Sequence, residues 1–199
     1  MSINQITNQS QNQETTKALI IESFHGKFAS SGFSNEDIIR IAESFWQFPS
    51  KDSLNKQYIV TIDQNILGTM LLKRKNDEQP SIKEILSLIP SFNFFKLIKL
   101  LSIFSILEHH VAENEVYIDH IVASEEYRGQ GVGSSLLEEA KQTIKSSEFL
   151  SLYVADTNTQ AIHLYQQQGF KIIETKTSLI RKHLISEEKW HYMIFQSTN

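Results

Sequence analysis

The chain has 199 residues, of which 40% are hydrophobic and 21% charged, so it is long enough for one domain with a sizeable core and cramped for two. Its net charge of -4 argues against nucleic acid as the main partner, and its lack of cysteine excludes disulfides, zinc-thiolate sites and a cysteinyl acyl-enzyme. A polar tail over about residues 1–13 has no signal-peptide pattern, so we expect a single cytoplasmic domain over residues 1–199.

The N-terminal half predicts a strand, two helices and a β-hairpin. Apolar residues at helical spacing follow the tail, and Ser34 is a typical N-cap for the second helix. Two apolar runs flank a polar turn at residues 63–65, which is the pattern of a hairpin. The predicted bounds are 3–6 for the strand, 15–28 for the first helix, Ser34 to Pro49 for the second, and 58–62 and 66–72 for the hairpin.

An apolar helical insertion is expected over about residues 80–114. Within residues 94–107 the polar residues recur only every third position, so they spiral around a 3.6-residue helix and leave no face cleanly polar. Fourteen residues at about 1.5 Å each cover roughly 21 Å, which is too short to span a hydrocarbon core of about 30 Å. The insertion could be core, a lid over a substrate cavity, a homodimer contact or a membrane-surface segment.

The C-terminal half predicts four strands, two helices and a glycine-rich loop. Strict alternation along the first strand places Glu115, Tyr117, Asp119, Ile121 and Ala123 on one face, and His120 on the opposite face. We expect strands at 115–123, 149–155, 170–175 and 190–195, and helices at 134–147 and 159–168.

The glycine loop RGQGVG, residues 128–133, lies at a strand-to-helix junction, where bare backbone N–H groups and the helix dipole can hold a phosphate. A P-loop would need a lysine after the last glycine, and a dinucleotide fingerprint would need glycine at the position of Ser134. Both patterns fit poorly. Taken alone, the loop could also be a plain turn.

Two motifs in sequence resemble the GNAT superfamily of acyl-CoA-dependent N-acetyltransferases. Arg128, Gly131 and Gly133 match its pyrophosphate motif, and NTQAIHLYQQQGF over residues 158–170 matches its second motif. The resemblance is close over about residues 115–175, the expected CoA-binding core. It implies an α/β (α+β) fold of three layers, whose central sheet is mixed, largely antiparallel and splayed around the acyl-CoA site. It also implies acetyl-CoA as co-substrate and an amine acceptor. No metal is expected, because His109 and His110 are adjacent and no second ligand pair with metal-site spacing is evident.

The resemblance assigns acetyl-CoA binding to the end of one strand, the glycine loop and the second motif. Arg128 could add charge at the phosphates or be solvated, and Asn158 could touch the pantetheine arm or cap a helix. The residues so assigned are Ile121, Val122, Ala123, Arg128, Gly129, Gln130, Gly131, Val132, Gly133, Ser134, Asn158 and Tyr165.

The candidate catalytic residues are one tyrosine and, as general base, one of two carboxylates. Tyr165 could donate a proton or a hydrogen bond to the leaving thiolate, or only pack on its helix. Asp119 is the first choice as general base, directly or through water, and Glu115 the second, while His120 is expected to be structural. These roles predict direct acetyl transfer to a primary amine. The alternative is a non-catalytic acyl-CoA-binding sensor or interaction module.

Overall fold

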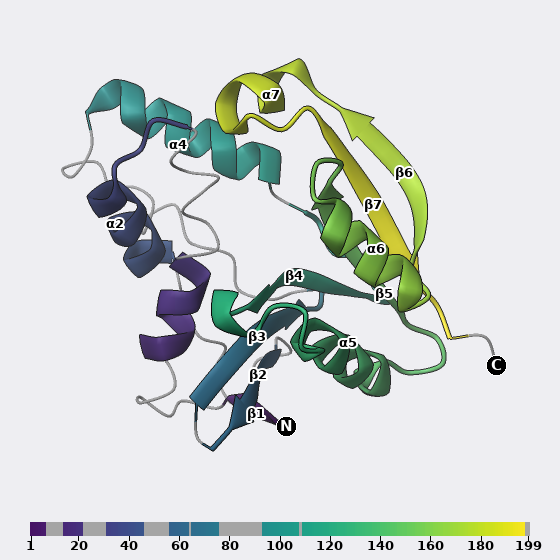
Figure 1. Cartoon of the computed structure of the whole chain (residues 1–199). Coiled ribbons are helices and arrows are strands. Elements are labelled where there is room, and N and C mark those ends of the chain that lie inside the picture. Colours follow the sequence, from purple (N-terminus) through teal and green to yellow (C-terminus); the bar gives the residue numbers. More distant parts are fainter. Residues whose placement is uncertain are drawn as a thin grey trace.

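The computed structural model describes residues 1–6, 14–21, 31–45, 56–63, 65–75, 93–107 and 109–197. A seven-stranded sheet runs through the molecule in the order β1-β2-β3-β4-β5-β7-β6 (Figure 1). The strands are β1 (Ser2–Ile6), β2 (Lys56–Ile62), β3 (Asn65–Lys73), β4 (Glu115–Ala123), β5 (Phe149–Ala155), β6 (Lys171–Thr177) and β7 (Lys189–Phe195). The helices are α2 (Asn35–Phe45), α4 (Phe94–Leu107), α5 (Val132–Thr143), α6 (Thr159–Gln167), α7 (Leu179–Ile185) and the 3-10 turn η2 (Glu125–Tyr127). Residues 14–21 are also helical.

The sheet is mixed, as predicted. Every neighbouring pair of strands is antiparallel except β4 and β5, which run parallel. The fold class and the β2–β3 hairpin are therefore confirmed, and β4, β5 and α4 have the predicted bounds. Residues 22–28 of the first predicted helix and 80–92 of the insertion lie outside the described residues.

Helices α5 and α7 differ most from the sequence-based prediction, and α5 ends at Thr143 where residue 147 was expected. Helix α5 begins at Val132, two residues early, because Gly131 in the left-handed conformation lets the chain turn directly into the helix. Helix α7 was not predicted, although Ser178 is a good N-cap, since its side chain accepts a hydrogen bond from the backbone of Arg181 at 3.2 Å.

Helices cover both faces of the sheet. Helices α5 and α6 share one hydrophobic cluster, with α5 over the strands β1 to β4 and α6 over β5 and β7 (Figure 1). Helices α2, α4 and α7 build a second cluster on the other face, against the ends of β5 and β7. The molecule therefore has the three layers that the sequence predicted.

Helix α2 begins with a reciprocal capping interaction. The Ser34 hydroxyl accepts a hydrogen bond from the backbone N–H of Asp37 at 3.2 Å, and the Asp37 carboxylate accepts one from the backbone N–H of Ser34 at 3.0 Å. The same carboxylate accepts a hydrogen bond from Lys96 of α4 at 2.6 Å. One side chain thus caps α2 and ties it to the inserted helix.

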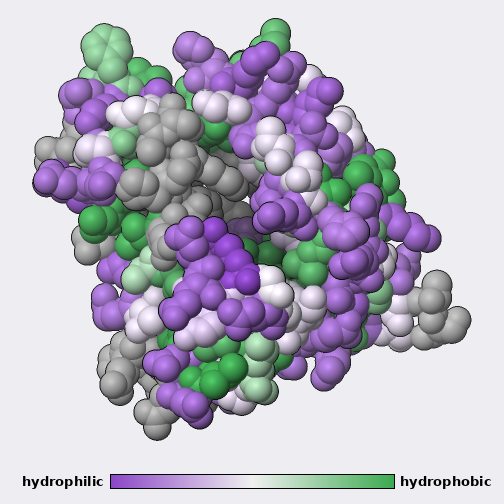
Figure 2. All heavy atoms as spheres, in the orientation of Figure 1, coloured by the Kyte–Doolittle hydropathy of each residue, from purple (hydrophilic) through white to green (hydrophobic). Residues whose placement is uncertain are grey.

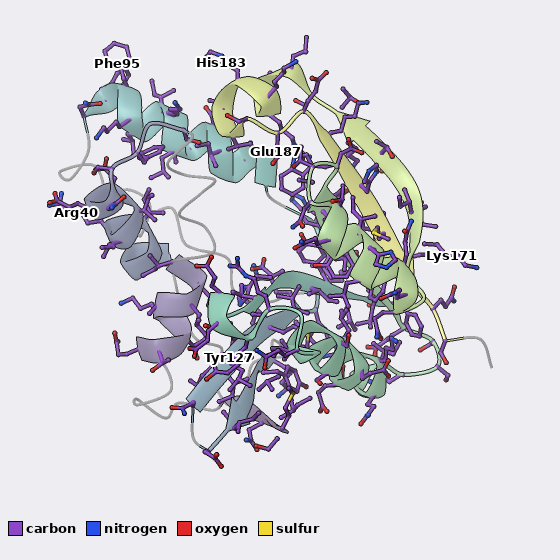
Figure 3. The ribbon with its side chains drawn as sticks, viewed as in Figure 1. Arg40, Phe95, Tyr127, Lys171, His183 and Glu187 are labelled. Atoms are coloured by element: carbon purple, nitrogen blue, oxygen red, sulfur yellow. The ribbon has the colours of Figure 1, made fainter. Side chains whose placement is uncertain are left out.

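Helix α4 is buried on one side and exposed on the other. Leu100 and Ile103 are fully buried in the second cluster, whereas Phe94 and Phe95 are 69% and 81% exposed. Figure 3 shows Phe95 pointing away from the body of the molecule at the start of α4. Within the described parts of the chain, no helix is long and apolar enough to cross a membrane.

The partial burial of α4 predicts different effects of truncating two adjacent leucines. Leu100→Ala should lower the free energy of unfolding by about 2–5 kcal/mol, because a fully buried side chain leaves a cavity. Leu101→Ala, at a side chain that is 38% exposed, is the matched control and should cost less than about 1 kcal/mol. Urea denaturation measures both, and equal losses would contradict the described packing of α4.

Candidate active site

The sheet opens between its two parallel strands. β4 and β5 pair only through Glu115 with Phe149, Val116 with Leu150, and Tyr117 with Ser151. Past this point, β4 stays paired with β3 and β5 with β7, but no pairing joins β4 to β5. Figure 2 shows a hollow near the centre of the molecule's face, in the region between these two halves of the sheet.

A buried carboxylate, Glu115, forms hydrogen bonds at the end of the sheet where β4 and β5 are still paired. Glu115 accepts hydrogen bonds from the His109 ring at 2.8 Å, the Ala112 backbone at 2.8 Å, the Tyr192 hydroxyl at 2.7 Å and the Ser151 hydroxyl. Burial alone would raise the pKa of Glu115, but these four donors outweigh it and lower the pKa to about 2. The carboxylate is therefore ionised and fully engaged, which makes it a poor proton acceptor.

Aromatic rings pack around this carboxylate. The ring centroids of His109 and Tyr117 lie 4.4 Å apart, and those of Tyr153 and Tyr192 lie 5.0 Å apart. His109 also lies 5.5 Å from Tyr153. The sequence did not predict His109, Ser151 and Tyr192 as partners of Glu115, because these residues come from separate segments that only the fold brings together.

A β-bulge at Asp119 changes which side chains of β4 share a face. Leu71 pairs with His120 and Leu72 with Ile118, so Asp119 is the extra residue on β4. The predicted strict alternation is therefore wrong beyond this point. His120 lies on the same face as Asp119 and Tyr117, and Ile121 lies on the face that packs toward α5.

Asp119 lies between two basic side chains. Its carboxylate oxygens contact the Lys73 ammonium at 2.5 Å and the His120 ring nitrogen Nδ1 at 3.3 Å. Burial would raise the pKa of Asp119, but Lys73 and His120 hold it well below the usual range of a carboxyl. Burial lowers the pKa of His120, against the raising effect of Asp119, so this histidine is neutral near pH 7.

The glycine loop has the geometry of an anion seat. Gly129 and Gly131 have φ angles of 77° and 85°, in the left-handed region that favours glycine. A Cβ at either position would meet no atom within 4 Å, so the loop surface is open. Gly131 caps α5 without a side-chain hydrogen bond, so the first backbone N–H groups of the helix, from Val132 to Ser134, have no acceptor within the helix.

Glycines also let the backbones around this loop approach closely. A Cβ on Gly68 of β3 would lie 2.5 Å from the Val132 side chain and 2.6 Å from the Val122 carbonyl oxygen. A Cβ on Gly133 would lie 2.9 Å from the Leu164 side chain of α6. Gly68 was missed from the sequence, although a glycine inside a strand is a recognised signal of close backbone approach.

The polar side chains assigned to acetyl-CoA binding lie in this loop and at the start of α6. Arg128 is exposed, with its guanidinium 4.0 Å from Glu125, and Gln130 donates a hydrogen bond to the Glu126 carbonyl at 3.0 Å. Asn158 caps α6, because its side-chain oxygen accepts a hydrogen bond from the Ala161 backbone at 3.2 Å. This is the structural role that the sequence left open for Asn158.

Tyr165 lies in the core shared by α5 and α6, with its ring centroid 6.0 Å from that of Phe170. Burial raises the pKa of its hydroxyl well above the usual value. The Tyr165 side chain is 7% exposed, so the phenol lies among apolar side chains rather than in water.

A sheet that parts between two parallel strands, beside a glycine turn into a helix, is the arrangement that the resemblance to the GNAT superfamily implies. The model of the Acetyltransferase (GNAT) family matches residues 21–170. Because this match covers well over half of the chain, the chain belongs to the GNAT family and is an acetyl-CoA-dependent acetyltransferase.

Solved structures agree with this fold. An N-acetyltransferase from Staphylococcus aureus Mu50 is similar with a TM-score of 0.65 and 15% identity over 98% of this chain and 100% of that one. A GNAT family acetyltransferase from Elizabethkingia anophelis, solved with acetyl-CoA bound, has a TM-score of 0.54 and 14% identity over 98% and 97%. A spermidine N-acetyltransferase chimera from Vibrio cholerae has a TM-score of 0.54 and 14% identity over 98% and 97%.

The depressed pKa of Glu115 predicts a pH-dependent contribution to stability. Its folded pKa of about 2 lies below the ordinary 4.5, so the stabilisation is present above about pH 5 and is lost as the pH falls toward 2. The shift corresponds to on the order of 3 kcal/mol. Glu115→Gln should therefore have a lower free energy of unfolding than the wild type at pH 7. The difference in unfolding free energy between the two should become smaller as the pH falls below about 5.

Urea denaturation between pH 7 and pH 3 measures this difference in unfolding free energy. Glu113→Gln is the matched control, because Glu113 is exposed and pairs only with the exposed Lys75 among the contacts described. The free energy of unfolding of this control should stay within about 1 kcal/mol of the wild-type value. A gap for Glu115→Gln that is constant with pH would contradict the assignment of Glu115 as a buried carboxylate.

Proposed function

We propose that this acetyltransferase moves an acetyl group from acetyl-CoA directly to a primary amine of a small molecule or peptide, with both substrates bound together. The observation that carries the proposal is the parting of β4 from β5 directly beside the start of α5. Beyond this point one edge of β4 has no strand partner from β5, and this edge lies next to the glycine turn that would bind phosphate.

The chain's own residues would hold acetyl-CoA mainly through the backbone. N–H groups from Gly129 to Ser134 would bind the pyrophosphate, helped by the positive end of the α5 dipole. Backbone groups of Ile121, Val122 and Ala123, on the edge of β4 that β5 leaves, would pair with the pantetheine arm. The N–H groups on this edge would also polarise the thioester carbonyl and stabilise the tetrahedral oxyanion.

Tyr165 would stabilise the leaving thiolate by a hydrogen bond. A CoA-like thiol has a pKa of about 8.5 and a free phenol about 10, so full proton transfer from tyrosine is uphill even without burial. Burial raises the pKa of Tyr165 further, which keeps its proton in place. The hydroxyl therefore acts as a hydrogen-bond donor to the sulfur rather than as a full proton donor.

Direct transfer follows from composition as well as from geometry. The chain has no cysteine, so the most familiar acyl-enzyme intermediate for thioester exchange has no nucleophile here. The acceptor must then reach the thioester itself. Helices α5 and α6 cover one face of the sheet, and the described part of the second helix cluster packs against the ends of β5 and β7 on the other. The acceptor would therefore approach on the face opposite α5, where Tyr117 and Asp119 lie.

The test is thiol release from acetyl-CoA with a panel of amines. Spermidine belongs in the panel because a structural relative is a spermidine N-acetyltransferase, and lysine peptides, peptide N-termini and aminoglycosides complete it. We expect at least one amine to release CoA with a matching acetylated product by mass spectrometry. Tight acetyl-CoA binding without turnover on any amine would instead support a non-catalytic sensor.

Tyr165→Phe tests the thiolate role. Loss of one hydrogen bond to a developing charge should lower kcat roughly 10- to 100-fold, while acetyl-CoA affinity changes less than about threefold. Tyr58→Phe is the matched control, because Tyr58 is buried in the same hydrophobic cluster. If Tyr165→Phe keeps the wild-type kcat, Tyr165 is only a packing residue.

A further inference from the structure

An exposed apolar surface extends along α4 and onto α7 at one edge of the molecule. The two helices contact each other, and together they carry six of the large hydrophobic side chains that stay exposed in the described part of the chain. We call this the α4/α7 surface, and its members are Phe94, Phe95, Ile98, Leu101, Leu179 and Ile180. Ile98, Leu101 and Ile180 also line a hollow of about 440 Å³ between the helices.

The exposed side chains of α4 form one stripe along the helix. Phe94, Ile98 and Leu101 follow one another at steps of four and three residues, which places them on the same side. The opposite side holds Leu100 and Ile103, which are fully buried. The helix therefore has an inner face that fixes it to the protein and an outer apolar face that stays exposed.

The largest side chains of this surface project from the molecule. Phe95 is the most exposed large hydrophobic residue among those described, and Leu179 of α7 follows at 73%. Figure 3 shows Phe95 and His183 pointing outward at the same edge, one from each helix, and Figure 2 shows hydrophobic side chains where α4 begins. A fluid lipid interface accepts projecting rings without a preformed cavity, whereas a folded protein must supply a matching pocket.

The charged residues of the two helices are all basic. They include four of the chain's 19 basic residues and none of its 23 acidic ones, although the net charge of the chain is -4. These four are Lys96, Lys99, Arg181 and Lys182. Asp37 of α2 pairs with Lys96, and Glu188 pairs with Lys182, so only part of this charge is balanced by the pairs described. A basic region on an acidic protein favours an anionic partner.

Charge also argues against a second copy of the chain as the occupant of this surface. A symmetric dimer brings the same patch of both copies face to face, so the cations of one α4/α7 surface would meet those of the other. Like charges across an interface cost binding free energy. The surface of an anionic bilayer offers negative headgroups beside an apolar interior, which complements both the charges and the exposed rings.

We propose that the α4/α7 surface docks on a bilayer surface that contains anionic lipid. Phe94, Phe95 and Leu179 enter the boundary between headgroups and acyl chains, and Lys99 and Lys182 contact headgroup phosphates. Helix α4 lies in the plane of the bilayer, because its 14 residues are too few to span it. Figure 1 shows α4 and α7 at the other end of the molecule from α5, so docking leaves the glycine turn before α5 accessible.

Co-sedimentation of the whole chain with lipid vesicles tests the proposal. Vesicles of phosphatidylcholine with about 30% phosphatidylglycerol supply an anionic surface, and vesicles of phosphatidylcholine alone supply a neutral one. We expect roughly fivefold or more tighter binding to the anionic vesicles. This preference should fade as the salt concentration rises from about 0.1 M to about 1 M, because salt screens the attraction between lysines and headgroups.

Two variants separate the apolar from the electrostatic part of the binding. Phe94→Ala combined with Phe95→Ala should weaken binding to anionic vesicles roughly tenfold or more, because two rings no longer enter the interface. Lys99→Gln should weaken the same binding roughly fivefold and leave binding to neutral vesicles unchanged.

Each variant has a matched control elsewhere on the molecule. Ile62→Ala truncates an exposed apolar side chain on the β2–β3 hairpin, which lies at the other end of the molecule from α4 and α7 (Figure 1). Lys171→Gln removes an exposed positive charge from β6, where Figure 3 shows Lys171 far from Phe95. Both controls should bind vesicles like the wild type, and circular dichroism checks that every variant is folded.

A wild type that binds neither kind of vesicle would overturn the proposal. A folded double variant of Phe94 and Phe95 that binds like the wild type would overturn it as well. Light scattering without lipid tests the other occupant, since a dimer that the double variant dissociates would show that a second copy covers this surface instead. None of these measurements needs an amine acceptor, so their outcome is independent of the proposed acetyl transfer.

Discussion

The site depends on where the two central strands stop pairing. Glu115 and its four hydrogen-bond donors lock β4 and β5 together at their first three residue pairs, and these donors come from β5, β7 and the segment before β4. A buried carboxylate with this many partners is costly to disturb, so the junction is rigid. The strands can then diverge from a fixed point, which sets the width of the opening beside α5.

The bulge at Asp119 acts on the same strand a few residues later. It turns the second half of β4 over, so that Ile121 packs toward α5 while His120 lies on the opposite face. One extra residue thereby places the Ile121 side chain on one face of the strand and the Asp119 and His120 side chains on the other.

Much of this arrangement was predictable from the sequence, for identifiable reasons. The hairpin, β4, β5 and α4 have strong periodicity, and the two motifs over residues 128–133 and 158–170 indicated the family and its splayed sheet. The bulge was not predictable, because nothing in EVYIDHIVA distinguishes an extra residue from strict alternation. The partners of Glu115 were not predictable either, because Ser151 and Tyr192 meet it only through strand register.

The central claim is that the glycine turn before α5 seats acetyl-CoA, and titration calorimetry with acetyl-CoA tests it most directly. Gly131→Asp places a side chain and a negative charge at the open loop, whereas Gly32→Asp makes the same change at a glycine of similar conformation, with a φ angle of 75° and open surroundings, in the turn before α2. We predict that Gly131→Asp weakens acetyl-CoA binding at least 100-fold while Gly32→Asp binds like the wild type. Wild-type affinity in a folded Gly131→Asp variant would contradict the account.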